Sequence, residues 1–105
     1  MKKKIAILGS TGSIGSSTLD IIRKDKKSFE VVFLSANNNS KKLIKQAREF
    51  NVKNVLIKNE SLVSKVKFSL KKRDVNVYSG NTNMSDVISG KVDYTIAGIV
   101  GIAGL

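Results

Sequence analysis

The sequence contains no cysteine and no histidine. Without cysteine, neither a disulfide framework nor a thiolate metal site is possible. Without histidine, the commonest general base and the commonest metal ligand are missing. Proline and tryptophan are also absent, and with two tyrosines and four phenylalanines few rings are available for stacking on nucleic-acid bases. These absences favour a binding function over catalysis by the chain itself.

Long apolar runs are missing as well. No segment reaches the length of a transmembrane helix, and Ile5–Leu8, after the basic amino end, is too short for the apolar region of a signal peptide. We therefore expect a cytoplasmic protein with no membrane partner. A chain of 105 residues is long enough for one domain with a core, but short for a complete dinucleotide-dependent enzyme.

Positive charge is abundant. Lysine and arginine number 19 against eight acidic residues, for a net charge of +11, which is a reason to consider nucleic acid as a partner. Residues 36–75 hold eleven of these cations against three acids, on the polar faces of two expected helices. They are interleaved with asparagine and serine and lack aromatic partners. The pattern therefore predicts a solvated, lysine-rich surface and no specific nucleic-acid partner.

Three glycines at three-residue intervals follow a short apolar segment. Lys4–Leu8 is typical of a buried parallel strand, and Ser16–Lys24 carries apolar residues at helical spacing. Such a strand-to-helix junction is where a doubly wound sheet binds a nucleotide. In this interpretation Gly9 permits the sharp turn off the strand, Gly12 leaves room for a pyrophosphate, and Gly15 lets the helix lie close to the sheet.

The glycine spacing, Gly-x-x-Gly-x-x-Gly, is one residue longer in its first gap than the usual dinucleotide fingerprint. A glycine triplet can also serve a purely structural turn, but here the strand before it and the helix after it match the context that the motif requires. A mononucleotide phosphate loop is excluded, because no Gly-Lys-Ser/Thr follows at the required distance. The free N–H groups and the dipole of the helix favour an anion. The pattern therefore predicts nucleotide binding.

The second expected strand, over residues 30–35, ends in the run Ala36–Ser40. An acidic residue at this place would hydrogen-bond the ribose 2′-hydroxyl and repel a 2′-phosphate. The chain instead offers three asparagines and a serine, followed by Lys41 and Lys42, which favours NADP over NAD. The alternative is that residues 37–40 only form a loop and cap the next helix, and both roles can hold together.

Strands alternate with amphipathic helices along the whole chain, as in parallel α/β sheets with right-handed crossovers. We predict one domain over residues 1–105, with a Rossmann-like doubly wound sheet of about five strands and a cofactor cleft at the carboxyl ends of the first two. Asn59 is expected to cap a helix that ends in Lys71–Arg73, and a short helix is expected from Asn81 or Thr82 to Gly90. The expected strands are 4–8, 30–35, 52–57, 75–78 and 93–97, and the other expected helices are 16–24 and 40–50.

The two ends of the chain resemble one family. Ala6–Gly15, followed by Ser17–Asp20, closely resembles the opening of 1-deoxy-D-xylulose 5-phosphate reductoisomerases. Ala97–Leu105 looks like the second signature of that family, a strand and turn that closes over the cofactor. The resemblance covers essentially the whole chain, but only the amino-terminal cofactor domain of the family. Because the chain stops on small and apolar residues, we expect it to be truncated there, without the catalytic and carboxyl-terminal domains.

The resemblance implies an activity and a set of cofactor contacts. Members of the family rearrange 1-deoxy-D-xylulose 5-phosphate and reduce the resulting aldehyde with NADPH to 2-C-methyl-D-erythritol 4-phosphate, in the non-mevalonate route to isoprenoids. Many members have a basic residue where Asn38 stands, and an amide offers a hydrogen bond without charge. The implied cofactor-binding residues are Thr11, Gly12, Ser13 and Ile14 around the pyrophosphate and ribose, and Asn37, Asn38 and Asn39 in the 2′-phosphate region.

The family also uses a divalent metal, magnesium or manganese, held by carboxylates in a catalytic domain that binds the sugar phosphate. The acidic residues of this chain form no Asp-x-Glu pair, so we assign it no catalytic and no metal-binding residue and expect it to be inactive alone. For the full-length enzyme the resemblance implies a homodimer. Two alternatives stay open: the cofactor domain of another NAD(P)-dependent dehydrogenase, against which Gly101–Leu105 speaks, or a basic nucleotide- or nucleic-acid-binding module.

Overall fold

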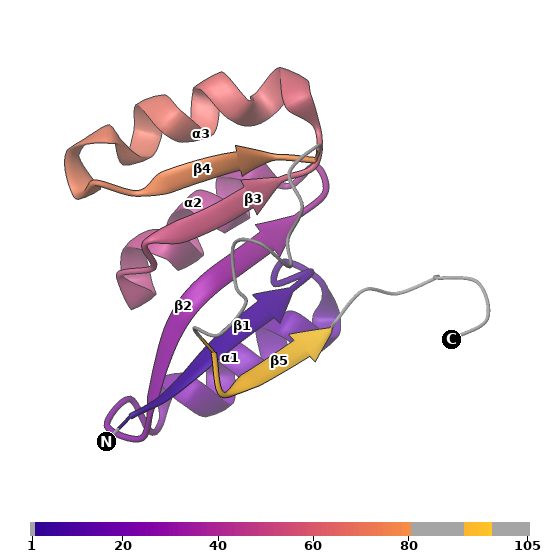
Figure 1. The fold of residues 1–105 in the computed structure, drawn as a ribbon. Helices are drawn as coiled ribbons and strands as arrows, with labels where there is room; N and C mark the ends of the chain where they lie inside the picture. The colour runs from indigo at the N-terminus through magenta and orange to yellow at the C-terminus, as the bar shows by residue number, and fades with distance from the viewer. Residues whose placement is uncertain (1, 81–91, 98–105) are drawn as a thin grey trace.

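The computed structural model describes residues 2–80 and 92–97, which form a five-stranded parallel sheet with helices packed on it (Figure 1). The strand order is β4-β3-β2-β1-β5. The strands are β1 (Lys3–Leu8), β2 (Phe29–Ala36), β3 (Asn54–Ile57), β4 (Asn76–Ser79) and β5 (Tyr94–Ala97). The α-helices are α1 (Ser13–Arg23), α2 (Ser40–Phe50) and α3 (Val63–Leu70), and the short 3₁₀ helices are η1 (Glu60–Leu62) and η2 (Lys71–Arg73).

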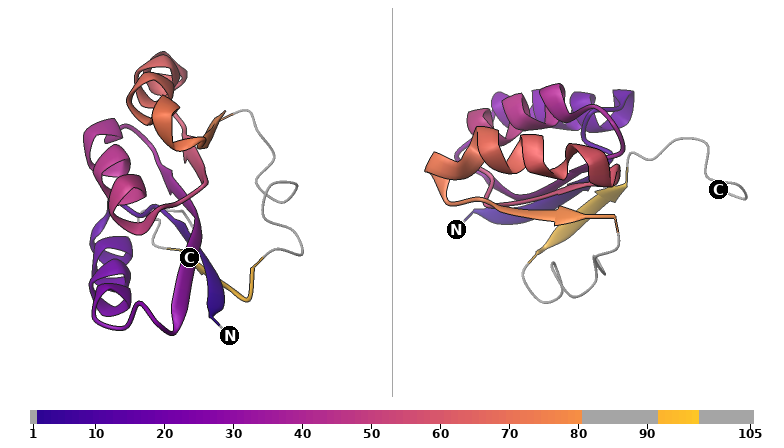
Figure 2. Two further views of the ribbon diagram at one scale, coloured as in Figure 1. Left: turned by 90° about the vertical axis from the view of Figure 1, so that its left-hand side faces the viewer. Right: turned by 90° about the horizontal axis from the view of Figure 1, so that it is seen from above.

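The strand order changes direction at β1. Ile7 of β1 lies opposite Leu34 of β2 on one side and Ile96 of β5 on the other. From β1 the chain steps outward through β2, β3 and β4, and the connecting helices α1, α2 and α3 cover the same face of the sheet (Figure 2). Ligands of parallel α/β sheets bind at the carboxyl ends of the strands where the order reverses. The predicted fold class is confirmed, and with it the pairing of the first two strands.

Apolar side chains are buried on both faces of the sheet. Ala6, Phe33 and Leu56 form a small cluster, and because successive strand residues point to opposite faces, it lies on the face away from the helices. Burial on both faces explains why the central strands are apolar without alternation. The larger cluster, between sheet and helices, includes Ile7, Leu19, Ile22, Leu34, Leu43, Val55, Val66 and Leu70.

Helix boundaries differ from the expected ones in two places. The first helix, α1, begins at Ser13 rather than Ser16, because Gly12 is already the extended residue before the helix (φ −81°, ψ 179°). Asn59 caps η1 instead of one long helix: its Oδ1 accepts a hydrogen bond from the Ser61 backbone N–H (3.0 Å), and α3 follows at Val63. The helix expected between residues 81 and 90 lies outside the described residues.

Candidate functional site

The glycine-rich loop joins the carboxyl end of β1 to the amino end of α1. Gly9 has a positive φ of 74°, a conformation that side chains disfavour, and the Gly12 N–H donates to the Gly9 carbonyl (3.1 Å) to close a turn. A Cβ atom at position 15 would lie 2.5 Å from the Gly9 oxygen and 2.6 Å from Ser10 Cα. The turn predicted at Gly9 is confirmed. Gly15 does permit a close approach of α1, but to the backbone of loop residues Gly9 and Ser10 rather than to the sheet itself.

The amino end of α1 has the properties of an anion site. Within the described part of the chain, no side chain caps the helix at Gly12, and its first turn carries no acidic residue. The first N–H groups of an α-helix have no partner within the helix, and together with the helix dipole they attract an anion. Ser13 is exposed, Thr11 and Gly12 are half-buried, and the Ile14 side chain is 53% exposed. This surface suits an anionic group that is joined to an apolar group able to pack on Ile14.

The asparagine run stands at the carboxyl end of β2, beside the glycine-rich loop. All three asparagines are exposed. Asn39 Oδ1 accepts a hydrogen bond from the Lys42 backbone N–H (3.2 Å), so the predicted capping role is confirmed for this residue. Asn38 Oδ1 accepts from Asn59 Nδ2 (3.0 Å), a bond that occupies the acceptor of Asn38 and neither of its amide donors. The sequence analysis did not anticipate this pair.

Lys42 connects the two loops. Its ammonium group lies 3.1 Å from the Thr11 carbonyl, in the middle of the glycine-rich loop, and its own backbone N–H receives the Asn39 cap. The backbone of Lys42 is therefore bonded to the asparagine run, and its positively charged ammonium group lies at the glycine-rich loop. The structure thus brings the two predicted groups of site residues, 11–14 and 37–39, to one edge of the sheet.

Two buried residues that the sequence analysis missed hold the loop from behind. Ser10 Oγ donates to Gln46 Oε1 (2.8 Å), and Gln46 Nε2 donates back to the Ser10 carbonyl (3.0 Å). The Gly9 N–H donates to Ser35 Oγ (3.1 Å) and the Ser10 N–H to the Ser35 carbonyl (2.8 Å). The only signal for Gln46 in the sequence is its position three residues after Leu43, on the apolar side of α2.

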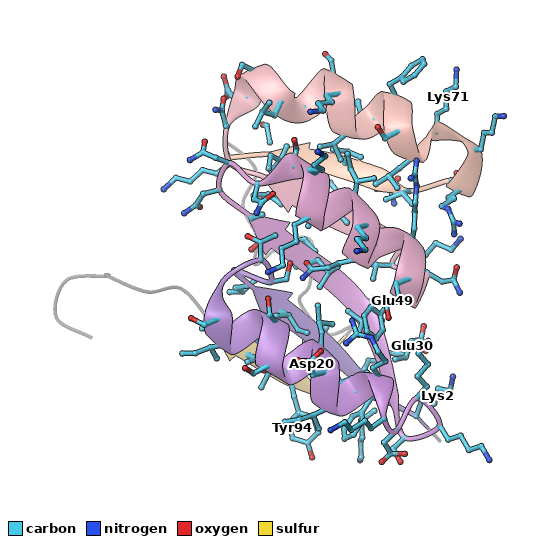
Figure 3. The ribbon with its side chains drawn as sticks, turned by 180° about the vertical axis from the view of Figure 1, so that it is seen from behind. Lys2, Asp20, Glu30, Glu49, Lys71 and Tyr94 are labelled. Carbon is cyan, nitrogen blue, oxygen red and sulfur yellow. The ribbon has the colours of Figure 1, made fainter. Side chains whose placement is uncertain are left out.

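An ion pair joins α1 to α2 in their last turns, at the ends of the helices opposite to the site. The Arg23 guanidinium is hydrogen-bonded to both carboxylate oxygens of Glu49 and also contacts Asp20. Figure 3 shows Asp20 on α1 and Glu49 on the neighbouring α2. The hydrogen bonds from Arg23 lower the pKa of the Glu49 carboxyl, and its charge adds to the effect; the pKa of Arg23 is raised by the same contacts. This cluster fastens the two helices that carry the site.

In residues 2–80 and 92–97, no three His, Cys, Asp or Glu residues lie close enough together to hold a metal ion. Over the same residues, no helix is both long and apolar enough to cross a membrane. The chemistry that the described edge offers is therefore hydrogen bonding and positive charge toward an anionic ligand.

A parallel sheet that reverses its order at β1, with a glycine-rich loop at an uncapped helix, places the protein in the Rossmann-like class of α/β domains. The family model of 1-deoxy-D-xylulose 5-phosphate reductoisomerase matches residues 5–105. The chain belongs to this family, and the resemblance stated from the sequence is confirmed.

Individual relatives agree with the family match. Reductoisomerases of Thermoanaerobacter sp. (strain X514) and Pelagibacter ubique (strain HTCC1062) are 43% and 44% identical over 98% of this chain. The solved Zymomonas mobilis reductoisomerase in complex with NADPH superposes with a TM-score of 0.88 at 34% identity, over 96% of this chain and 27% of that one. A reductoisomerase solved with NADPH, fosmidomycin and magnesium gives 0.85 at 29% identity, over 94% and 25%. The chain spans about 27% of the length of the curated relatives.

Proposed function

We propose that the chain forms the NADPH-binding part of an enzyme that isomerises and reduces 1-deoxy-D-xylulose 5-phosphate to 2-C-methyl-D-erythritol 4-phosphate. The observation that carries the proposal is the uncapped, acid-free amino end of α1, beside a β2 terminus without a carboxylate. Two solved relatives are complexes with NADPH, which supports the same cofactor here.

In this proposal different site residues bind different parts of the cofactor. The N–H groups of Ser13 and Ile14, in the first turn of α1, donate to the pyrophosphate, which Thr11 and Gly12 border. The exposed Ile14 side chain packs against the adjoining ribose. Asn37, Asn38 and Asn39 surround the 2′-phosphate, with the amide donors of Asn38 directed to it and Lys42 adding charge. NADPH supplies the hydride, and these residues bind and orient it.

The remaining parts of the activity belong to the same proposal. Magnesium or manganese and the sugar phosphate would be held by segments of the family's longer chains that this chain does not span, because the described residues bring no metal-ligand cluster together. A relative solved with fosmidomycin and magnesium supports such a site in the family. A homodimer, which the family resemblance implies, also belongs to the proposal. So do a cytoplasmic location, from the lack of long apolar runs, and the absence of a specific nucleic-acid partner, from the scarcity of aromatic residues beside the cations.

Titration of the chain with NADPH and NADH tests the proposal, with nicotinamide fluorescence as the signal. We expect NADPH to bind more tightly than NADH, and Gly12→Val to weaken NADPH binding more than tenfold, an order of magnitude set by losing one charge-assisted contact. Gly12 has an extended conformation (φ −81°, ψ 179°) that valine also adopts, so the variant should fold.

Ser17→Val places the same side chain on the exposed surface of α1 and serves as the matched control, with NADPH affinity expected to stay within twofold, about 0.4 kcal/mol. Equal affinity for the two cofactors, or undiminished binding by Gly12→Val, would show that the edge described above is not the NADPH site.

A further inference from the structure

A buried polar cluster lies directly behind the glycine-rich loop. Ser10 is fully buried, and Ser35 and Gln46 are each only 6% exposed. They come from three elements, the loop, β2 and α2, and are joined by the hydrogen bonds given above. Ser10 Oγ also lies 3.4 Å from the Ser35 carbonyl. Across the described residues, every buried side-chain nitrogen and oxygen has a hydrogen-bond partner. The buried polar atoms of this cluster are therefore all satisfied.

The position of Gln46 makes this cluster unusual for a helix packed on a sheet. Gln46 shares the buried side of α2 with Leu43 and Ala47, where an apolar side chain would pack at no polar cost. A buried amide loses its hydrogen bonds to water, and only well-made hydrogen bonds within the protein offset that loss. Its net stabilising effect is therefore small, and what it contributes is a defined position for the groups to which it binds.

The group positioned is the Ser10–Thr11 peptide. Gln46 Nε2 holds the Ser10 carbonyl from inside the protein (3.0 Å), and Ser16 Oγ approaches the same oxygen (3.5 Å). This peptide is trans, and in a trans peptide the N–H points opposite to the carbonyl. The Thr11 N–H is thereby directed away from Gln46, toward the outer side of the loop, where the proposed pyrophosphate lies.

We propose that Gln46, with Ser10 and Ser35, positions the glycine-rich loop so that the Thr11 N–H, together with the first N–H groups of α1, is directed at the cofactor pyrophosphate. These three are positioning residues and touch no cofactor atom. The inference rests on the proposed function, since it names what holds the NADPH site in shape. It distinguishes two parts of that site: the pyrophosphate contacts depend on the cluster, and the 2′-phosphate contacts of residues 37–39 do not.

The test compares two ligands on the same variants. NADPH contains the pyrophosphate, whereas adenosine 2′-monophosphate carries the adenine, ribose and 2′-phosphate without it. In Gln46→Met, which keeps the length of the side chain and removes its hydrogen bonds, NADPH should bind about tenfold more weakly, as loss of one hydrogen-bond contact implies. Adenosine 2′-monophosphate should bind within twofold of the unaltered chain, about 0.4 kcal/mol. Ser35→Ala removes only the acceptor of the Gly9 N–H. It should also lower the ratio of NADPH affinity to adenosine 2′-monophosphate affinity, and it tests the inference if Gln46→Met does not fold.

Asn54→Val is the matched control, because Asn54 Nδ2 donates to the Val32 carbonyl (3.4 Å) at the start of β3, the end of the strand opposite to the site. It should lower the unfolding temperature and leave the ratio of the two affinities unchanged. An unchanged ratio in Gln46→Met and Ser35→Ala, with NADPH binding to the unaltered chain intact, overturns the inference alone. Failure of the unaltered chain to bind NADPH overturns the proposed function and the inference with it.

Discussion

At the scale of single residues, cofactor choice depends on one amide at the end of β2. Asn38 uses its oxygen to accept from Asn59 Nδ2, which leaves an N–H₂ group as its contribution to an anion. We expect Asn38→Asp to reverse the preference from NADPH to NADH. A carboxylate would repel the 2′-phosphate and accept from the 2′-hydroxyl, and losing a charge-assisted bond worth about 1.5–3 kcal/mol lowers NADPH affinity more than tenfold.

Fluorescence titration of both cofactors at equal ionic strength measures this reversal. Asn51→Asp is the control, because it makes the same charge change at the end of α2, where Arg73 Nη1 donates to Asn51 Oδ1 (3.3 Å) and an aspartate oxygen can accept instead. Asn51 has a positive φ of 53°, as Asp74 does at 55°, so aspartate suits the backbone. An Asn38→Asp chain that still prefers NADPH would show that the 2′-phosphate is bound elsewhere.

Residues with local reasons for their identity were the ones that sequence analysis could predict. Gly9, Gly15 and the Asn39 cap follow from a strand, a turn and a helix in immediate succession. The Ser10–Gln46 and Asn38–Asn59 bonds could not be predicted, since they join residues 36 and 21 positions apart. Such pairs become visible only when the order of the strands and the rotation of α2 are known.

At the scale of elements, α1 and α2 are held together by Arg23 and Glu49. The contact lowers the pKa of Glu49 in the folded protein. The folded state therefore binds the proton less readily than the unfolded state, and the ion pair contributes stability above the unfolded pKa of about 4.3. That contribution is lost as pH falls through the folded pKa. Because both side chains are partly exposed, solvent screening limits it to about 0.5–1 kcal/mol.

Thermal unfolding from neutral pH down to about pH 3 checks this prediction. Glu49→Gln should unfold a few degrees below the unaltered chain at neutral pH, and the difference should shrink as the pH falls below the ordinary glutamate value. Glu30→Gln, the same change on the exposed surface of β2, serves as the reference. A difference between Glu49→Gln and the unaltered chain that stays constant with pH would mean that the carboxylate charge contributes nothing.

The elements themselves were predicted well where the apolar pattern is strong. The expected helix over 40–50 matches α2, and the first two expected strands agree with β1 and β2 within a residue at each end. The start of α1 was missed because Ser13 and Ile14, with Gly15, look like loop residues when read locally. Asn59 was correctly expected as a cap, but the turn it starts is 3₁₀ before it becomes α, a distinction that depends on packing.

At the scale of the whole molecule, the sequence predicts a parallel sheet but not the complete order of its strands. Alternation of strands and helices implies parallel pairing of neighbours, and this holds from β1 to β4. The placement of β5 beside β1 joins segments far apart in the chain, and the hydrophobic periodicity of the sequence does not predict it. It is this placement that leaves the carboxyl end of β1 at the reversal of the strand order, where a ligand can be bound.

Charge also acts at this scale, and some of the cations make hydrogen bonds within the fold. Arg48 Nη2 donates to the Ser69 carbonyl (3.0 Å), and Lys53 Nζ donates to the Arg73 carbonyl (3.2 Å), at the carboxyl ends of α3 and η2. Cations at these places offset the negative ends of helix dipoles. Phe68 is 69% exposed, and Lys71 lies 4.4 Å from its ring centre. Arg48, Phe68, Lys71 and Arg73 line an open hollow of about 720 Å³, together with Ser69 and Lys72. Phe68 is the single aromatic residue in this lining, whereas binding of a single strand depends on several rings on which successive bases stack.

We therefore expect any binding of nucleic acid to be weak, independent of base sequence and lost as salt rises. The net charge of +11 attracts a polyanion by releasing its counterions, so affinity should fall by orders of magnitude between roughly 50 and 200 mM salt. Fluorescence anisotropy with two oligonucleotides of equal length and unrelated sequence measures both properties. Gly12→Val separates this attraction from the cofactor site, because it should leave oligonucleotide binding unchanged while it weakens NADPH binding. A complex that distinguishes the two sequences at 200 mM salt, about the physiological range, would instead establish a specific nucleic-acid surface on this domain.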